Sequence, residues 1–150
     1  MMTGVNMLHV PYRGAPPALT DLIAGQVHVM FDNMPSSIEH IRAGRLRPLA
    51  VTATTRLEAL PDVPPVGDSV PGFETSAWAG IGAPKNTPAE IIDTLNREIN
   101  AVLAEPAIRT RVADLGGEVL ALSPSEYTRR IAEETDKWAK VIKFSGAKAE

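Results

Sequence analysis

The sequence predicts an α/β fold in which a parallel βαβ sheet is followed by C-terminal helices. Residues 5–52 alternate apolar, extended runs with helical patterns over short connections, which is typical of parallel βαβ units. Residues 53–76 are rich in proline and interrupt regular structure, as a functional loop or a connection between lobes does. From residue 87 onward, apolar side chains recur every three or four positions, which predicts amphipathic helices.

The first part of the chain contains three expected strands and two expected helices. The strands are Val5–Tyr12, Val27–Phe31 and Leu46–Thr52. The first helix follows Pro16 and Pro17, because the first helical turn does not need the missing N–H groups, and Gly25 ends it. The second helix is short and stops at Gly44, and Ser36 and Ser37 are expected to cap its start.

The second part is predicted to be mainly helical, with short strands at Ala77–Ala83 and Glu118–Leu122. Two sequences have the capping-box form, Thr87-Pro88-Ala89-Glu90 and Ser123-Pro124-Ser125-Glu126, and each precedes an apolar stripe. The stripes are Ile91, Leu95, Ile99 and Leu103, and then Tyr127, Ile131, Trp138 and Ile142. A helix between them starts at Pro106 and ends at Gly116-Gly117, and the last helix runs to Gly146.

Composition excludes several classes of function. The 150 residues are 44% apolar and 22% charged, as in ordinary globular proteins. A net charge of -3 gives no general attraction to nucleic acid, and the absence of cysteine removes thiolate nucleophiles and thiolate metal sites. No apolar run is long enough to span a membrane, and the first residues lack the pattern of an export signal.

Catalytic and metal-binding motifs are weak. The three histidines, His9, His28 and His40, are not paired at metal-ligand spacing, so no metal is expected. Asp32, Ser36, Ser37 and His40 are close in sequence, but no G-x-S-x-G elbow accompanies them. Gly80-Ile81-Gly82 falls short of a phosphate-binding loop, and a strand glycine that admits close packing is the favoured interpretation.

The carboxyl ends of the predicted strands carry the candidate ligand-binding residues. Ligands of open α/β sheets bind at these ends, and the helix start after the first strand favours an anion. The candidates are Tyr12, Arg13, Gly14, Asp32 and Asn33, with Thr52 the weakest of the set. Turn residues with no ligand role are the equally good alternative for Arg13-Gly14 and Asp32-Asn33.

Several segments resemble one family of transport proteins. They are His9-Val10-Pro11-Tyr12-Arg13-Gly14, residues 17–27, Met30-Phe31-Asp32-Asn33, residues 43–52, Leu60-Pro61-Asp62-Val63-Pro64, Pro71-Gly72-Phe73-Glu74, Ala83-Pro84 and the final helix with Trp138. Together they resemble the substrate-binding receptors of tripartite tricarboxylate transporters, the Bug family, over nearly the whole chain.

The resemblance implies a type II periplasmic-binding-protein fold with two lobes, of which this chain is the C-terminal half. Residues 1–72 are then the end of one lobe, and residues 73–150 complete the other. The implied function is capture of a small carboxylate, a di- or tricarboxylate or an amino-acid-like anion, for membrane permease subunits. Such receptors are not enzymes and need no cofactor. The implied location is the periplasm, although the chain as written has no signal peptide and is expected to stay in the cytoplasm.

Three alternatives stay open beside the receptor. They are an inert truncated remnant, a cytosolic effector-sensing module of related fold, and a hydrolase that uses Ser36 or Ser37. Self-association of the partial chain is also expected, because its helical stripes and an open sheet edge lack cover.

Overall fold

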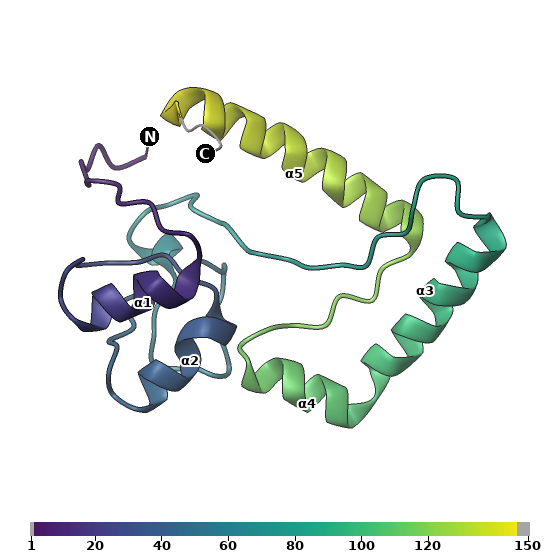
Figure 1. Ribbon diagram of the computed structural model, residues 1–150, viewed down its shortest axis with the longest axis horizontal. Helices are drawn as coiled ribbons and strands as arrows, with labels where there is room; N and C mark the ends of the chain where they lie inside the picture. Colours follow the sequence, from purple (N-terminus) through teal and green to yellow (C-terminus); the bar gives the residue numbers. More distant parts are fainter. Residues whose placement is uncertain (1, 147–150) are drawn as a thin grey trace. The chain divides into compact units, whose positions relative to one another are not determined.

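The computed structural model describes residues 2–146, which form two compact units. The N-terminal unit comprises residues 2–79 and 110–118, and the helical unit comprises residues 80–109 and 119–146. Helices dominate the regular structure (Figure 1). In chain order these are α1 (Ala15–Ile23), α2 (Met34–Arg42), the short 3-10 helix η1 (Val66–Asp68), α3 (Ala89–Ala104), α4 (Pro106–Asp114) and α5 (Pro124–Ser145).

The predicted glycine at the end of α1 is confirmed. Gly25 adopts a left-handed φ of 74°, which glycine reaches without the penalty that a Cβ atom brings. Its N–H donates to the carbonyl of Leu22 at 3.1 Å, and the N–H of Gln26 donates to Asp21 at 2.8 Å. These two bonds form a Schellman motif, which satisfies the last carbonyls of the helix. Gly44 ends α2 by the same motif.

The start of α2 differs from the prediction. The helix begins at Met34, so Ser36 and Ser37 lie inside the first turn and do not cap it. Pro35 suits this first turn, which extends the helix ahead of the serines. The two hydroxyls donate to the carbonyl of Asn33 at 2.7 and 3.4 Å, the backward bonding that serine makes within helices.

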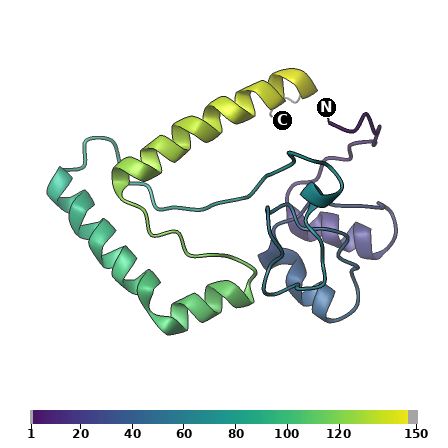
Figure 2. The same cartoon turned by 180° about the vertical axis from the view of Figure 1, so that it is seen from behind.

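The predicted sheet is not formed among residues 2–146. No arrow is drawn in Figure 1 or Figure 2, and the only pairings among the described residues are isolated bridges, Val51 with Pro65 and Leu57 with Leu60. The segments predicted as strands are Val5–Tyr12, Val27–Phe31, Leu46–Thr52, Ala77–Ala83 and Glu118–Leu122. A strand requires a row of hydrogen-bonded neighbours as well as a suitable sequence, and within the described chain these segments have only the single bridge of Val51 with Pro65.

The buried core lies in the N-terminal unit, where α1 and α2 pack against each other. The buried apolar side chains are Ala18, Leu19, Ile38, Val51 and Val63. Ile38 is fully buried, and burial of a side chain of this size stabilises by about 1.5–3 kcal/mol. This small core fixes the two helices that follow the candidate ligand loops.

Local polar contacts organise the helical unit. Leu122 lies just ahead of α5, and its carbonyl accepts hydrogen bonds from the Nδ2 atoms of Asn96 at 2.9 Å and Asn100 at 3.3 Å, both on α3. The aromatic ring of Tyr127 lies directly against Gly80, where a Cβ atom would collide with it. Close packing at Gly80, expected from the sequence, is therefore present, although Gly80 is not in a strand.

Only one of the two predicted capping boxes forms. Ser123 Oγ accepts from the N–H of Glu126 at 3.3 Å, and Glu126 Oε2 accepts from the N–H of Ser123 at 2.8 Å. At α3 the N-cap position falls on Pro88, which has no N–H to donate. The hydroxyl of Thr87 instead donates to the carbonyl of Pro84 at 2.8 Å, so the prediction of a capping box there was wrong.

Candidate functional site

The loop ahead of α1 is held by a bond between Tyr12 and the helix that follows. The Tyr12 hydroxyl donates to Oδ2 of Asp21 at 2.8 Å, and both side chains are partly buried. This hydrogen bond raises the pKa of Tyr12, with smaller contributions from desolvation and from the negative charge of Asp21. Tyr12 therefore anchors the loop, and its hydroxyl hydrogen is engaged within the chain.

The next two residues of this loop are open to solvent. Arg13 is exposed, and the structure gives it no ion pair with any described residue. Gly14 is the N-cap of α1 with φ 121° and ψ 176°, a conformation that side chains disfavour. Pro16 and Pro17 lack N–H groups, so this helix start offers fewer amide donors to an anion than an ordinary one.

The Asp32-Asn33 turn is tied to α2 through one hydroxyl. Ser36 Oγ lies 2.7 Å from Asp32 Oδ2 and 2.7 Å from the carbonyl oxygen of Asn33. Asn33 is the N-cap residue of α2, but its side chain makes no capping bond and is exposed. The amide of Asn33 is thus available to a ligand, whereas one carboxylate oxygen of Asp32 is already bonded.

Thr52 shares no hydrogen bond with either of these two turns in the described chain. Its carbonyl accepts from the N–H of Thr75 at 3.2 Å, next to the bridge between Val51 and Pro65. The side chain is partly buried, and the structure shows no hydrogen bond from it to the described residues.

All six candidates belong to the N-terminal unit, but they remain in separate local networks. Within residues 2–146, no hydrogen bond joins one predicted strand end to another, and convergence on one ligand stays a prediction. Sequence reasoning missed the partners Asp21 and Ser36. Ser36 could have been recognised, because it is four residues after Asp32 at a helix start, whereas nothing local marks Asp21 as the partner of Tyr12.

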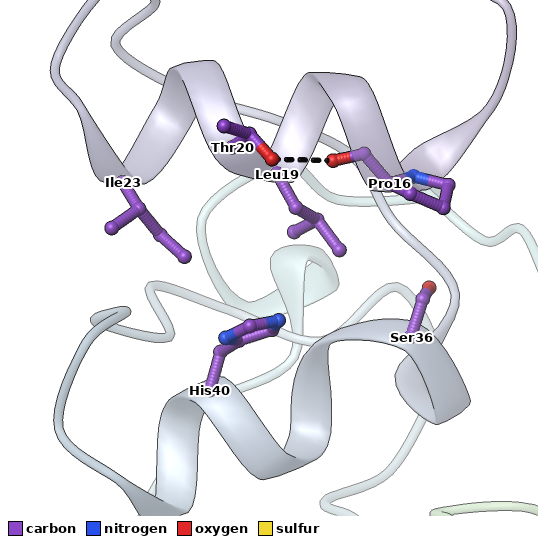
Figure 3. A pocket seen from close by; sticks show the side chains of 6 residues that line it. All are labelled: Pro16, Leu19, Thr20, Ile23, Ser36 and His40. Atoms are coloured by element: carbon purple, nitrogen blue, oxygen red, sulfur yellow. Dashed lines mark hydrogen bonds between the residues drawn. The ribbon is translucent and has the colours of Figure 1, made fainter.

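A groove with a volume of about 350 Å³ lies between α1 and α2 in this unit (Figure 3). Its lining contains none of the six candidates and consists of Pro16, Leu19, Thr20, Ile23, Ser36 and His40. His40 and Ser36 point from α2 toward α1. The Nδ1 atom of His40 is buried without a hydrogen-bond partner among the described residues.

This groove does not have the geometry of a hydrolase. In a catalytic triad the imidazole lies between the hydroxyl and the carboxylate. Here Ser36 binds Asp32 directly at 2.7 Å, and the described structure shows no bond between Ser36 and His40. Nor do the described residues contain a group of three or more His, Asp or Glu side chains that could hold a metal ion. Within the same residues, no helix is both long and apolar enough to cross a membrane.

Comparison with known proteins identifies the family. The family described as tripartite tricarboxylate transporter family receptor matches residues 1–147. The chain belongs to this receptor family. Members of the family are substrate-binding receptors and not enzymes, which removes the hydrolase alternative.

Individual receptors are similar over almost the whole chain. A UPF0065 protein of Pseudomonas sp. strain P51 is 40% identical over 140 residues, which is 92% of this chain and 42% of that protein. Among solved structures, an R. palustris protein with adipate has a TM-score of 0.90 and 40% identity, covering 97% of this chain and 49% of that one. MatC from Rhodopseudomonas palustris with bound malate has a TM-score of 0.75 and 33% identity, covering 89% and 47%.

These comparisons establish two further points. The chain spans about half the length of these relatives. Its structural neighbours are periplasmic binding proteins, as the resemblance implied, and they include BugD with a TM-score of 0.85.

Proposed function

We propose that the chain is part of a solute-binding receptor that captures a small carboxylate in the periplasm for the membrane permease of a tripartite tricarboxylate transporter. The observation that carries the proposal is the match to the R. palustris structure with adipate, at a TM-score of 0.90 over 97% of this chain. The malate complex of MatC supports the same class of ligand. A small di- or tricarboxylate is therefore the proposed solute.

The proposed contacts are divided by what each side chain already binds. Arg13, the N–H of Gly14 and the amide of Asn33 contact the ligand, because each is exposed and able to donate. Tyr12 and Asp32 fix the two loops through their own hydrogen bonds, because groups left with lone pairs alone have no hydrogen to donate to a carboxylate. The Thr52 hydroxyl is the weakest candidate contact.

The proposed arrangement places residues 1–72 at the end of one lobe and residues 73–150 in the other. In the full receptor, the extended segments of the N-terminal unit are strands of a parallel sheet. This supports the candidate loops as neighbours, since carboxyl ends of parallel strands meet at one edge of a sheet.

Calorimetric titration tests the function. The protein is titrated with adipate, malate and the diamine 1,6-diaminohexane, both as this chain and as a fusion with the part of the R. palustris protein that it does not match. The fusion is expected to bind a dicarboxylate and not the diamine. A fusion that folds but binds none of the three solutes contradicts the proposal.

The variant Arg13→Gln tests the site in the same fusion. Removing one exposed cation is expected to weaken dicarboxylate binding by a few-fold, because an exposed charge contributes about 0.3–1 kcal/mol. Arg109→Gln is the matched control, since Arg109 is an exposed arginine of the helical unit. Equal affinities of both variants and the parent would remove Arg13 from the site.

A further inference from the structure

The groove between α1 and α2 has the size and composition of a small-molecule pocket (Figure 3). Its volume of about 350 Å³ lies near the lower end of the roughly 300–1,000 Å³ that such pockets span. The wall from α1 is mainly apolar, with Pro16, Leu19 and Ile23. The wall from α2 supplies Ser36 and His40, which point toward α1. Apolar walls with a few directed polar groups are typical of pockets that bind organic ligands.

One ring atom in this groove is buried and has no hydrogen-bond partner among the described residues. It is Nδ1 of His40. A buried polar atom that stays unpaired costs stability, so native structures nearly always supply a partner from the protein, from water or from a ligand. In the tautomer that carries the ring hydrogen on Nε2, Nδ1 is an acceptor. The atom then marks a position where a hydrogen-bond donor from outside the chain fits.

The two hydroxyl groups of the lining have already used their hydrogens. The Thr20 hydroxyl donates to the carbonyl of Pro16 at 3.0 Å. The single hydrogen of the Ser36 hydroxyl has two acceptors at 2.7 Å, Oδ2 of Asp32 and the carbonyl of Asn33. Both oxygens keep lone pairs that accept. The two hydroxyls, like Nδ1 of the imidazole, therefore accept hydrogen bonds and have no hydrogen to offer a ligand.

We propose that this groove is a second binding site, which takes a small neutral compound with an apolar body and a hydroxyl group, such as a phenol. The ligand hydroxyl donates to Nδ1 of His40, and its ring lies against Leu19 and Ile23. A carboxylate fits poorly, because an ionised carboxylate only accepts hydrogen bonds. An ammonium group also fits poorly, since the six lining residues include no carboxylate to offset its charge. None of the six candidates of the carboxylate site lines this groove, so the two sites are distinct.

The test is a titration of the full chain with phenol in buffer without carboxylates, followed by nuclear magnetic resonance of the histidine rings. A saturable, one-to-one shift of the His40 ring signals is expected. Anisole, in which a methyl group replaces the hydroxyl hydrogen, and benzoate are each expected to bind at least fivefold more weakly, because neither has a hydrogen to donate. The nitrogen shifts of the free protein also report the tautomer, and a hydrogen found on Nδ1 overturns the proposal.

Two variants, studied by calorimetry with phenol, locate the site. His40→Phe keeps a ring but removes the acceptor and is expected to weaken binding at least fivefold. His28→Phe is the control, since it makes the same change at an exposed histidine outside the groove. Ile23→Trp is expected to abolish binding by filling the groove, and because Ile23 is 41% exposed, the buried core stays intact. Thermal melting of each variant checks that it is folded.

The same phenol titration is made with the fusion that carries the unmatched part of the R. palustris protein. Binding by both forms is expected, because every lining residue comes from this chain. Binding by the chain but not by the fusion overturns the proposal, since the groove is then covered in the longer receptor. The absence of a saturable shift in both forms, with water alone bonding His40, also overturns it. So do equal phenol affinities of the parent and His40→Phe. No carboxylate binding enters these measurements, so failure of the proposed function leaves them unaffected.

Discussion

The N-terminal unit and the helical unit are stabilised in different ways. In the first, a few buried side chains around Ile38 hold α1 against α2. In the second, polar contacts at helix ends, such as the box of Ser123 and Glu126, accompany an apolar surface that stays exposed. The difference shows that helices can follow local sequence rules with or without a core. The stability lost on mutation, in contrast, is largest where the side chain is buried.

The largest expected effect is loss of the N-terminal core. Ile38→Ala is expected to destabilise the N-terminal unit by about 2–5 kcal/mol, because it removes buried methyl groups and leaves a cavity. Leu95→Ala on α3 is the matched variant in the helical unit, and since Leu95 is 44% exposed, its effect is expected to be smaller than that of Ile38→Ala. Urea denaturation followed by circular dichroism measures both. Equal losses would mean that Leu95 is buried in solution.

The contact between Gly80 and Tyr127 gives the next largest effect. Gly80→Ala places a methyl group against the Tyr127 ring and is expected to destabilise the helical unit by about 1–3 kcal/mol. Gly82→Ala is the control, because a Cβ atom at Gly82 meets nothing within 4 Å. Thermal melting of the two variants compares them. Indistinguishable melting temperatures would show that the ring moves aside freely.

The two capping sequences predict a smaller difference. Ser123→Ala removes the side chain that accepts from Glu126 and is expected to reduce stability by about 0.5–2 kcal/mol. Thr87→Ala is expected to change it less, because the Thr87 hydroxyl bonds a loop carbonyl and caps no helix. The helicity and the denaturation midpoint of each variant measure the two losses of stability. A larger loss for Thr87→Ala than for Ser123→Ala would contradict the structure at the start of α3.

The smallest effect concerns pH and the bond between Tyr12 and Asp21. The folded pKa of Tyr12 is raised above its ordinary value of 10.0, so the bond contributes stability below that pH and loses it as pH rises through the folded pKa. Asp21→Asn is expected to lower the Tyr12 pKa. Absorbance of tyrosinate, recorded in a Tyr127→Phe background, isolates the Tyr12 signal. An unchanged titration would show that the bond does not form in solution.

The accuracy of sequence reasoning depended on the range of the interaction involved. Gly25, Gly44 and Gly116 end helices through bonds within a few residues, so their roles could be predicted. Among residues 2–146, the segments predicted as strands form only the isolated bridge of Val51 with Pro65, because pairing depends on residues distant in sequence. Proline follows the predicted N-cap residue in both capping sequences, so the local sequence could not separate the box that forms at Ser123 from the one that does not form at Thr87.

The candidate site shows the same limit. The identities of Tyr12, Arg13, Gly14, Asp32, Asn33 and Thr52 followed from their places after apolar runs. Their hydrogen bonds did not, because the partner of Tyr12 lies nine residues away on a helix face whose orientation depends on packing. Local sequence therefore located the loops but could not separate anchoring side chains from available ones.

The paired prolines of α1 have a consequence for selectivity. With Pro16 and Pro17 unable to donate, Gly14 and Ala15 supply the free amides at this helix start. In the proposed site, these two donors would hold one carboxylate group and leave it free to rotate about the line that joins them, so the two amides alone would sense charge without fixing the orientation of the solute. Discrimination between anions of different length or branching would then come from other parts of the receptor. Exchanging those parts between relatives should transfer the preference while α1 is left unchanged.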